Sequence, residues 1–238
     1  MSASMVSMRS LLSLTVAIVL VIIVPLEAFA AVTFPLPHEL MTDDDEAYMQ
    51  LVNADNLFDE ATFKKDLVPL KVRTSNNTEL RLRRAASRAL TDLFTAAENE
   101  GFKLYAISAY RDFATQRALY YNDIRDNDGV DDHSTQIPGA SEHQTGLAVD
   151  VVNREWLGYT LTGEFEKTAE AQWLAAHCAE FGFIIRYPKA KERITGIVYE
   201  PWHLRYVGQA PARYMMDNGI TLEELWLQWY LYLEDHGY

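Results

Sequence analysis

The pattern of apolar positions along the chain predicts a domain that mixes helices with short strands. Between Leu80 and Asn99, apolar residues recur at the spacing of one helix face, and Gly101 follows as a stop signal. The apolar runs Lys103–Ser108 and Leu147–Val152 are typical of strands. The segment Asp112–Arg125 predicts a second helix, for which Asp112 is available as an N-cap.

The second half of the chain continues this irregular alternation. A helix is expected over 166–181, because Gly182 ends its apolar pattern, and an amphipathic helix is expected over 222–235. Three further short strands are expected at 183–187, 194–200 and 202–207. Strands and helices do not follow a regular βαβ order, so the predicted fold class is α+β, with a small, mostly antiparallel sheet flanked by helices.

One connection is unusually long. Residues 126–140 form a polar segment that contains glycine and proline and separates the second helix from the strand at 147–152. Loops of this length in compact domains are usually functional or mobile.

Composition and charge narrow the range of functions. The chain has 238 residues, 49% of them hydrophobic, which is enough for one sizeable core. Its formal net charge of −13 repels phosphate backbones, so nucleic acid is not expected as a partner. Cys178 is the single cysteine; it cannot form an internal disulfide and is expected to be a small buried residue.

The N-terminus predicts export. Leu11–Leu26 is continuously apolar and follows the lone basic residue Arg9, and Ala28-Phe29-Ala30 fits the small-x-small pattern of signal peptidase sites. Residues 1–30 are therefore expected to be a cleavable signal peptide. The alternative is an uncleaved membrane anchor. Detection of Arg9 in the mature protein by mass spectrometry would refute cleavage.

Three segments contain polar residues that core formation does not require. His143 and Asp150 lie in one, Glu200 and His203 in another, and Arg111 lies where a strand gives way to a helix. Two histidines and a carboxylate are a ligand set for catalytic zinc, with water in the fourth position. Glu200 would then be the general base, and Arg111 would supply positive charge for an oxyanion or a substrate carboxylate.

Each of these residues also has an ordinary structural interpretation. A lone histidine is usually a surface residue or a hydrogen-bonded core residue. Asp150 could cap a loop, Glu200 could be an exposed charge, and Arg111 could pair with Asp112. Residue chemistry alone therefore supports a metallohydrolase only as a hypothesis.

The order of the motifs adds to this hypothesis. "YRDFATQ", "SEHQTGLAVD", "GFIIRYP" and "EPWHLRYVG" occur in that order, and the motifs S-x-H-x-x-G-x-A-x-D and E-x-W-H are both complete. From about Leu51 to Gly208, the chain closely resembles the VanY-type D-alanyl-D-alanine carboxypeptidases. These are zinc peptidases of peptidoglycan, of the LAS type, and are related more distantly to the VanX dipeptidases.

The resemblance implies a role for each matching residue. It implies one zinc ion on His143, Asp150 and His203, with Glu200 as the catalytic base and Arg111 as the residue that stabilises the transition state and holds the substrate. The residues implied to contact the C-terminal end of the peptide are Gln116, Ser141 and Tyr187. The implied fold is a compact α+β domain, Hedgehog/DD-peptidase-like, with zinc in a surface cleft.

The domain organisation follows from the same resemblance. After the signal peptide, residues 31–50 are expected to form a lead-in segment, 51–208 the catalytic domain, and 209–238 a helical tail. The expected function is hydrolysis of the terminal D-alanine of peptidoglycan stem peptides in the cell wall, the periplasm or the extracellular space.

Two alternatives remain open at this point. The same motifs serve L,D-carboxypeptidases that act on tetrapeptide stems, and a related fold could be a cell-wall binding module whose zinc is only structural. Glu200 argues against the second alternative, because a structural metal site does not need a base beside it. The sequence leaves the oligomeric state open.

Overall fold

The computed structural model describes residues 48–59, 66–75, 78–131 and 135–236. The predicted signal peptide and most of the lead-in segment lie outside the described residues, so their predictions stay predictions. Within the described part, no helix is both long and apolar enough to cross a membrane.

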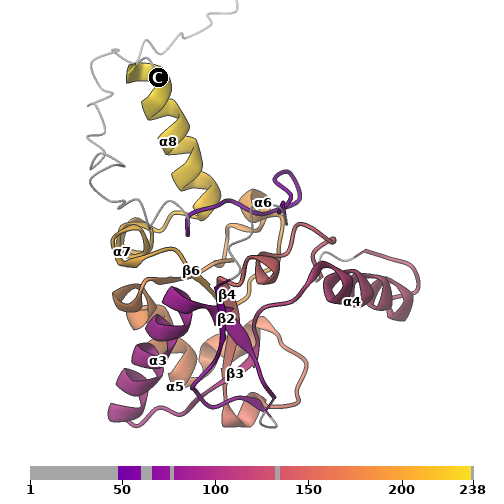
Figure 1. Cartoon of the computed structure of the whole chain (residues 1–238), viewed down its shortest axis with the longest axis vertical. Helices are drawn as coiled ribbons and strands as arrows, with labels where there is room; N and C mark the ends of the chain where they lie inside the picture. Colours follow the sequence, from indigo (N-terminus) through magenta and orange to yellow (C-terminus); the bar gives the residue numbers. More distant parts are fainter. Residues whose placement is uncertain (1–47, 60–65, 76–77, 132–134, 237–238) are drawn as a thin grey trace, which may run out of the picture. The chain divides into compact units, whose positions relative to one another are not determined.

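The centre of the fold is a four-stranded antiparallel sheet in the order β3-β4-β6-β5 (Figure 1). Its strands are β3 Leu104–Ser108, β4 Ala148–Asn153, β5 Phe183–Ile185 and β6 His203–Tyr206. A separate antiparallel pair joins β1 Leu67–Pro69 to β2 Arg81–Arg83. The predicted α+β class with a small antiparallel sheet is confirmed.

Helices and short 3₁₀ turns connect these strands. The α-helices are α3 Arg84–Asn99, α4 Phe113–Asp126, α5 Ala169–His177, α6 Glu192–Thr195, α7 Gln209–Asn218 and α8 Leu222–His236. The 3₁₀ turns are η4 Glu142–Thr145, η5 Arg154–Trp156, η6 Gly163–Lys167 and η7 Cys178–Phe181.

The core forms between the sheet and the helices α3 and α5. Every residue of β4 is buried, because β4 lies between two other strands and is covered on both faces. The apolar face of α3 packs on the same core, and Leu90, Leu93 and Ala97 are fully buried there. Cys178 is buried in this core and free, as expected.

The helix α4 begins where the sequence predicts. The carboxylate of its N-cap Asp112 accepts a hydrogen bond from the Thr115 backbone nitrogen at 2.7 Å. This bond satisfies one of the free N–H groups of the first turn. Gln116 is the buried residue of α4, and its Nε2 donates to the Gln136 carbonyl at 2.7 Å, which ties the helix to the long polar loop.

Two predicted elements are wrong. The strand expected at 194–200 does not form: the chain makes the short helix α6, and Gly196 then takes a left-handed conformation with φ of +73°. The helix expected over 166–181 is divided into η6, α5 and η7, although Gly182 does end this region, with φ of +81°. The tail contains α7 as well as the predicted α8.

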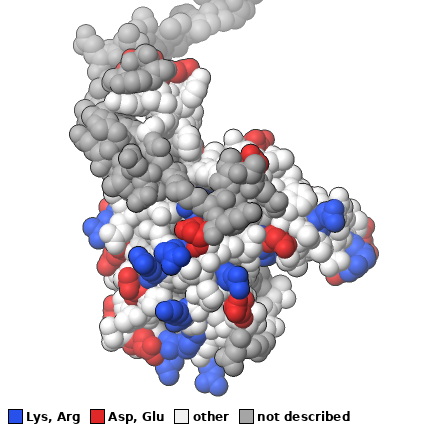
Figure 2. Space-filling view, in the orientation of Figure 1, with Lys and Arg blue, Asp and Glu red and all other residues white. Residues whose placement is uncertain are grey.

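Charged side chains of both signs occur on the face of the molecule shown in Figure 2. On the face shown in Figure 2, Lys and Arg are interspersed with Asp and Glu. The net charge of −13 is therefore not gathered into one acidic region on that face.

Candidate metal centre

Strand pairing brings two of the predicted ligands together. Asp150 of β4 lies directly opposite His203 of β6, although 53 positions separate them in the sequence. Directly paired residues of antiparallel strands project their side chains from the same face of the sheet. The third predicted ligand, His143, comes from η4, just before β4.

The three side chains meet in a buried cluster. One ligand atom from each of His143, Asp150 and His203 lies within 4.8 Å of the other two. His143 Nε2 is 3.3 Å from Asp150 Oδ2, and His203 Nδ1 is 3.2 Å from Asp150 Oδ1. The two imidazole rings lie nearly perpendicular, with centroids 4.9 Å apart.

The distances from the two imidazoles to the carboxylate of Asp150 are close to the separation of neighbouring ligands on zinc. Two ligand atoms that each lie about 2.1 Å from a tetrahedral zinc ion are about 3.4 Å apart. Each imidazole nitrogen lies near that distance from one oxygen of Asp150: His143 Nε2 is 3.3 Å from Oδ2, and His203 Nδ1 is 3.2 Å from Oδ1. Nitrogen and carboxylate oxygen are also suitable donor atoms for this ion.

The contacts of the second ring nitrogen show which nitrogen of each histidine faces the cluster. His143 Nδ1 donates to the Ala109 carbonyl oxygen at 2.7 Å, which leaves Nε2 directed at Asp150. His203 has the opposite arrangement: its Nδ1 faces Asp150, and its Nε2 faces the carboxylate of Glu142. A contact on the second nitrogen is the usual way in which proteins orient a metal-binding imidazole.

The electrostatics of the cluster favour an anionic centre that attracts cations. Burial, assisted by the nearby Arg111, lowers the pKa of His143 to about 4, so this ring is neutral. Burial opposes charge on His203, but its contacts with Asp150 and Glu142 outweigh burial and raise its pKa to about 9. Burial alone would raise the pKa of Asp150, yet the two imidazoles lower it well below its usual range. A bound cation would therefore replace the proton on His203.

Glu200 lies beside this cluster, at the start of a turn that leads into β6. It is followed by Pro201, and its Oε2 is 3.5 Å from His203 Nδ1. Burial raises its pKa to about 7, and the neighbouring carboxylate of Asp150 adds to this effect. A carboxylate whose pKa lies near neutrality can both accept and return a proton at physiological pH.

Arg111 faces the same space from the start of α4. Burial lowers its pKa, and the charges that offset this effect come from Asp150 and Glu200. Its Nε is buried without a hydrogen-bond acceptor among the described residues. An unpaired guanidinium N–H in such a place is suited to bind an anionic group of a ligand.

All the predicted site residues line one cavity of about 310 Å³. Besides the metal cluster, Glu200 and Arg111, these are Gln116, Ser141 and Tyr187. Tyr187 packs its ring against His203 with centroids 4.9 Å apart. Seven further residues complete the wall: Thr135, Gln136, Thr160, Leu161, Ile197, Val198 and Trp202. The cavity therefore combines a cation site, a base and a cationic side chain with a wall of both polar and apolar residues.

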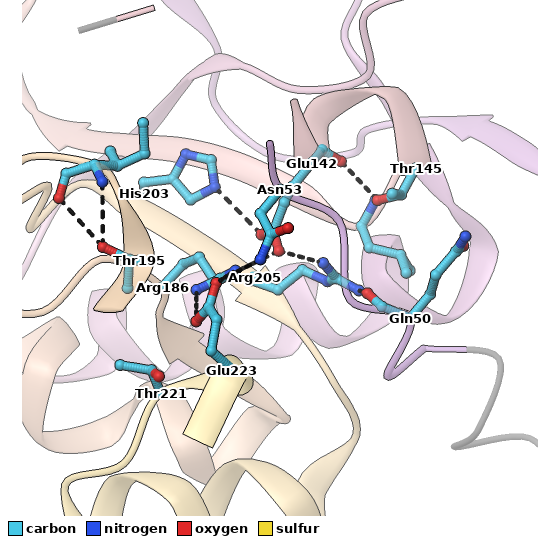
Figure 3. Close-up of polar contacts among 12 residues, drawn as sticks. Gln50, Asn53, Glu142, Thr145, Arg186, Thr195, His203, Arg205, Thr221 and Glu223 are labelled. Carbon is cyan, nitrogen blue, oxygen red and sulfur yellow. Dashed lines mark hydrogen bonds and ion pairs between the residues drawn. The ribbon is translucent and has the colours of Figure 1, made fainter. Parts of the chain in front are cut away.

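Sequence reasoning missed the buried charges behind the cavity. Glu142 is fully buried between Arg186 and Arg205, whose side chains are also fully buried (Figure 3). A signal for them was present: both arginines occur in otherwise apolar strand segments, "FIIRY" and "HLRY", where a charge requires a partner.

Comparisons with known proteins agree with this site. Residues 79–209, more than half of the chain, match the family described as VanY: D-alanyl-D-alanine carboxypeptidase. YodJ from Bacillus subtilis (strain 168) is 44% identical over 144 residues, which is 60% of this chain and 52% of YodJ. A D-alanyl-D-alanine carboxypeptidase from Enterococcus faecium is 38% identical over 117 residues, which is 49% of this chain and 34% of that protein. The chain thus spans about half and about a third of the length of these two relatives.

Two solved structures are similar over most of the described residues. The LdcB LD-carboxypeptidase aligns with a TM-score of 0.68 and 38% identity, covering 76% of this chain and 86% of LdcB. A variant of the vancomycin-resistance D,D-pentapeptidase VanY, solved in complex with Zn(II), aligns with a TM-score of 0.62 and 33% identity, covering 75% of this chain and 98% of VanY. The fold is therefore shared with both a D,D- and an L,D-carboxypeptidase.

Proposed function

Because this chain belongs to the VanY family of D-alanyl-D-alanine carboxypeptidases, we propose that it is a zinc carboxypeptidase that removes the terminal D-alanine from peptidoglycan stem peptides. One observation carries the proposal: His143, Asp150 and His203 converge on one point in a cavity that also contains Glu200 and Arg111. A non-catalytic metal site would not require a base and a cationic side chain in the same cavity.

The metal ion supported by the site is zinc. The donor set of two imidazoles and one carboxylate fits it, and one ligand atom from each of the three residues lies within 4.8 Å of the other two. When bound, zinc would polarise the scissile carbonyl and lower the pKa of a water molecule.

The side chains around the metal can perform hydrolysis. Glu200 takes a proton from the water molecule as its oxygen attacks the scissile carbonyl carbon. The C–N bond then breaks, and Glu200 returns the proton to the nitrogen of the leaving D-alanine. Arg111 donates hydrogen bonds to negative charge, either on the carbonyl oxygen in the transition state or on the free carboxylate of the substrate.

The remaining cavity residues would recognise the C-terminal end of the peptide. Gln116 Oε1 is buried without a hydrogen-bond donor among the described residues, so it can accept a bond from a ligand N–H. Ser141 and Tyr187 line the same cavity and offer hydroxyl groups.

An L,D-carboxypeptidase acting on tetrapeptide stems is the second candidate. The observation that favours it is the similarity to LdcB, with a TM-score of 0.68. Both activities need the same metal, base and carboxylate-binding group, and they differ in the configuration of the residue that precedes the scissile bond.

We also propose that the protein is exported, since its substrate lies outside the cytoplasm. The apolar run Leu11–Leu26 and the small residues after it support export. An exported protein that retains Arg9 would indicate an uncleaved anchor instead.

A direct assay tests the proposed function. The purified, zinc-loaded protein is incubated with a pentapeptide stem that ends in D-Ala-D-Ala and, separately, with a tetrapeptide stem, and the products are weighed and assayed for free D-alanine. We expect release from the pentapeptide. Release from the tetrapeptide alone would instead establish the L,D activity, and release from neither would refute a carboxypeptidase.

The variant Glu200→Ala tests the role of the base. It should keep one zinc ion per chain and lose activity by about 10²- to 10⁴-fold, because general base catalysis is removed while the ligands remain. Glu155→Ala, at an exposed glutamate of η5, is the matched control and should keep full activity. Normal turnover by Glu200→Ala would contradict the mechanism.

A further inference from the structure

Four charged groups, three of them fully buried, connect the metal centre to the tail helix α8. The groups are Glu142, Arg186, Arg205 and Glu223, which we call the buried charge chain (Figure 3). Two carboxylates face two guanidinium groups, so their formal charges balance. Groups of this kind are costly to bury and are stable only while every member keeps its partners.

Glu142 is the member that touches the metal centre. Its Oε1 accepts hydrogen bonds from Arg186 Nε at 2.7 Å and from Arg205 Nη1 at 2.6 Å. Its Oε2 lies 3.7 Å from His203 Nε2, and neither of these two buried atoms has a hydrogen-bond partner among the described residues. The two unsatisfied atoms therefore face each other.

The other histidine shows what this contact is suited to do. His143 is oriented by its Nδ1–H bond to the Ala109 carbonyl at 2.7 Å. His203 has no backbone carbonyl in that role, and Glu142 Oε2 occupies the corresponding place. A shift of less than about 1 Å would convert the 3.7 Å contact into a hydrogen bond of ordinary length. A carboxylate there fixes the ring and increases its basicity toward a metal ion.

The far end of the buried charge chain lies in the first turn of α8. Arg186 Nη1 and Nη2 form a bidentate pair with the Glu223 carboxylate, at 2.8 and 2.6 Å. Asn53 Nδ2 also donates to Glu223, at 3.2 Å. The start of a helix favours a carboxylate, so Glu223 has a second reason to stay in this position.

We propose that Glu142 is a positioning residue for His203, and that Glu223 of α8 holds Glu142 in place through Arg186. The tail helix thereby sets the affinity of the site for its metal ion. This inference rests on the proposed function only in taking zinc as that ion.

The physical reason lies in the competition for Glu142. Without the charge of Glu223, the buried Nη1 and Nη2 groups of Arg186 lose their carboxylate partner. Glu142 is then the remaining carboxylate bound to Arg186, and its Oε2 is drawn toward that guanidinium. His203 Nε2 would lose the group that faces it, and the ring would no longer be held for metal binding.

Glu223→Gln tests this coupling, with Glu224→Gln as the matched control. Each substitution removes one negative charge from the same turn of α8, but Glu224 pairs with Lys191 at 2.8 Å and has no bond to the buried charge chain. Zinc affinity is measured by competition with a chromophoric chelator, well below the melting temperature. We expect Glu223→Gln to bind zinc about 10- to 100-fold more weakly than the unmodified protein, and Glu224→Gln to remain within about twofold.

The melting temperature with and without saturating zinc separates positioning from general stability. A purely structural role would lower both melting temperatures equally and leave zinc affinity unchanged, and this result would overturn the inference. The inference requires that saturating zinc raises the melting temperature of Glu223→Gln by less than it raises that of the control, Glu224→Gln. If the unmodified protein binds no zinc, the proposed function itself fails.

A milder variant keeps the test decisive if Glu223→Gln does not fold. Glu223→Asp keeps the negative charge on a side chain that is one methylene shorter. It should weaken zinc binding by less than about tenfold, so its zinc affinity should lie between those of Glu224→Gln and Glu223→Gln. Affinity equal to that of the unmodified protein in every folded Glu223 variant would refute the coupling.

Discussion

At the scale of single residues, neighbouring charges give opposite properties to two chemically similar buried groups. Glu142 and Glu200 are both glutamates near His203, yet the pKa of Glu142 is held well below its usual range by Arg186 and Arg205 against the effect of burial. Burial raises the pKa of Glu200 to about 7, because no bonded arginine compensates for it. One residue type thus supplies a permanent charge and a proton acceptor within one site.

Cys178 allows a prediction at this scale. Burial raises the pKa of its thiol to about 12, so the thiolate that reacts with disulfide reagents is almost absent at pH 8. We expect the native thiol to react at least about 10³-fold more slowly than the thiol of the urea-unfolded protein. The rates of thiol labelling in the folded and the urea-unfolded protein measure this difference in reactivity. Rates that differ by less than about tenfold would show that Cys178 is not buried in the folded protein.

The same shift has a defined sign for stability. Above the unfolded pKa of about 9, the unfolded chain loses the thiol proton while the folded chain keeps it. Cys178 therefore reduces the free energy of unfolding as the pH rises from about 9 toward 12.

Individual site residues could be predicted from the sequence because their chemistry is explicit in short motifs. All eight predicted residues line the cavity, and Asp112 caps α4 as expected. The partners of Glu142 could not be predicted in the same way. They lie 44 and 63 positions away, and only the strand pairing shows that they meet.

At the scale of elements, Gly182 shows how a turn fixes the position of a strand. It ends η7 in a left-handed conformation, and the chain then enters β5. A Cβ atom on Gly182 would lie 2.8 Å from the Tyr206 ring and 3.0 Å from the Gly208 backbone carbon. The position therefore requires glycine for both conformation and space.

Gly182→Ala and Gly196→Ala separate these two requirements. Both glycines have positive φ, but a Cβ on Gly196 would meet no atom within 4 Å. Gly196→Ala should lower the free energy of unfolding by about 1–2 kcal/mol, from conformational strain alone. Gly182→Ala should add a steric cost of about 1–3 kcal/mol to that value. Urea denaturation measures the difference, and equal effects would show that the close contacts near Gly182 relax freely.

The spacing of apolar residues correctly predicted elements that bury one regular face. Elements without such a face were missed or wrongly predicted. The helix α3 was predicted because its apolar residues repeat on one side. The strand expected at 194–200 was inferred from β-branched residues, but Gly196 takes a left-handed turn that a paired strand does not permit. The short pair β1–β2 was missed, because its second strand carries Arg81 and Arg83 and gives no apolar run.

At the scale of the whole molecule, the metal centre is expected to stabilise the fold. Its three proposed ligands come from η4, β4 and β6, which are distant in sequence and join only in the folded state. An ion that binds the folded state alone stabilises it by about 2.7 kcal/mol when its free concentration is 100 times Kd.

Removal of the metal should therefore lower the melting temperature. For a domain of this size we expect a decrease of about 5–10 °C upon chelation, measured by thermal unfolding. Glu200→Ala should show the same decrease, because its ligands are intact, whereas His203→Ala should show almost none. A decrease of equal size in His203→Ala would mean that the chelator acts elsewhere.

The fold class was predictable at this scale, but the role of the tail was not. The sequence indicated an amphipathic helix over 222–235 without a partner for it. The structure provides the partners: Trp226 Nε1 donates to the Met49 carbonyl at 2.7 Å, and Glu223 pairs with Arg186. These contacts join segments more than 35 positions apart, which local sequence patterns do not encode.

The direct pairing of Asp150 with His203 has a consequence for how the chain can tolerate insertions and deletions. The many residues that connect β4 to β6 do not set the separation of these two side chains, so the connection can gain or lose residues at its exposed turns. Loss of one residue inside either strand would turn its side chain to the opposite face of the sheet. A change of loop length would thus leave the two ligands facing each other, whereas a change of length within either strand would not.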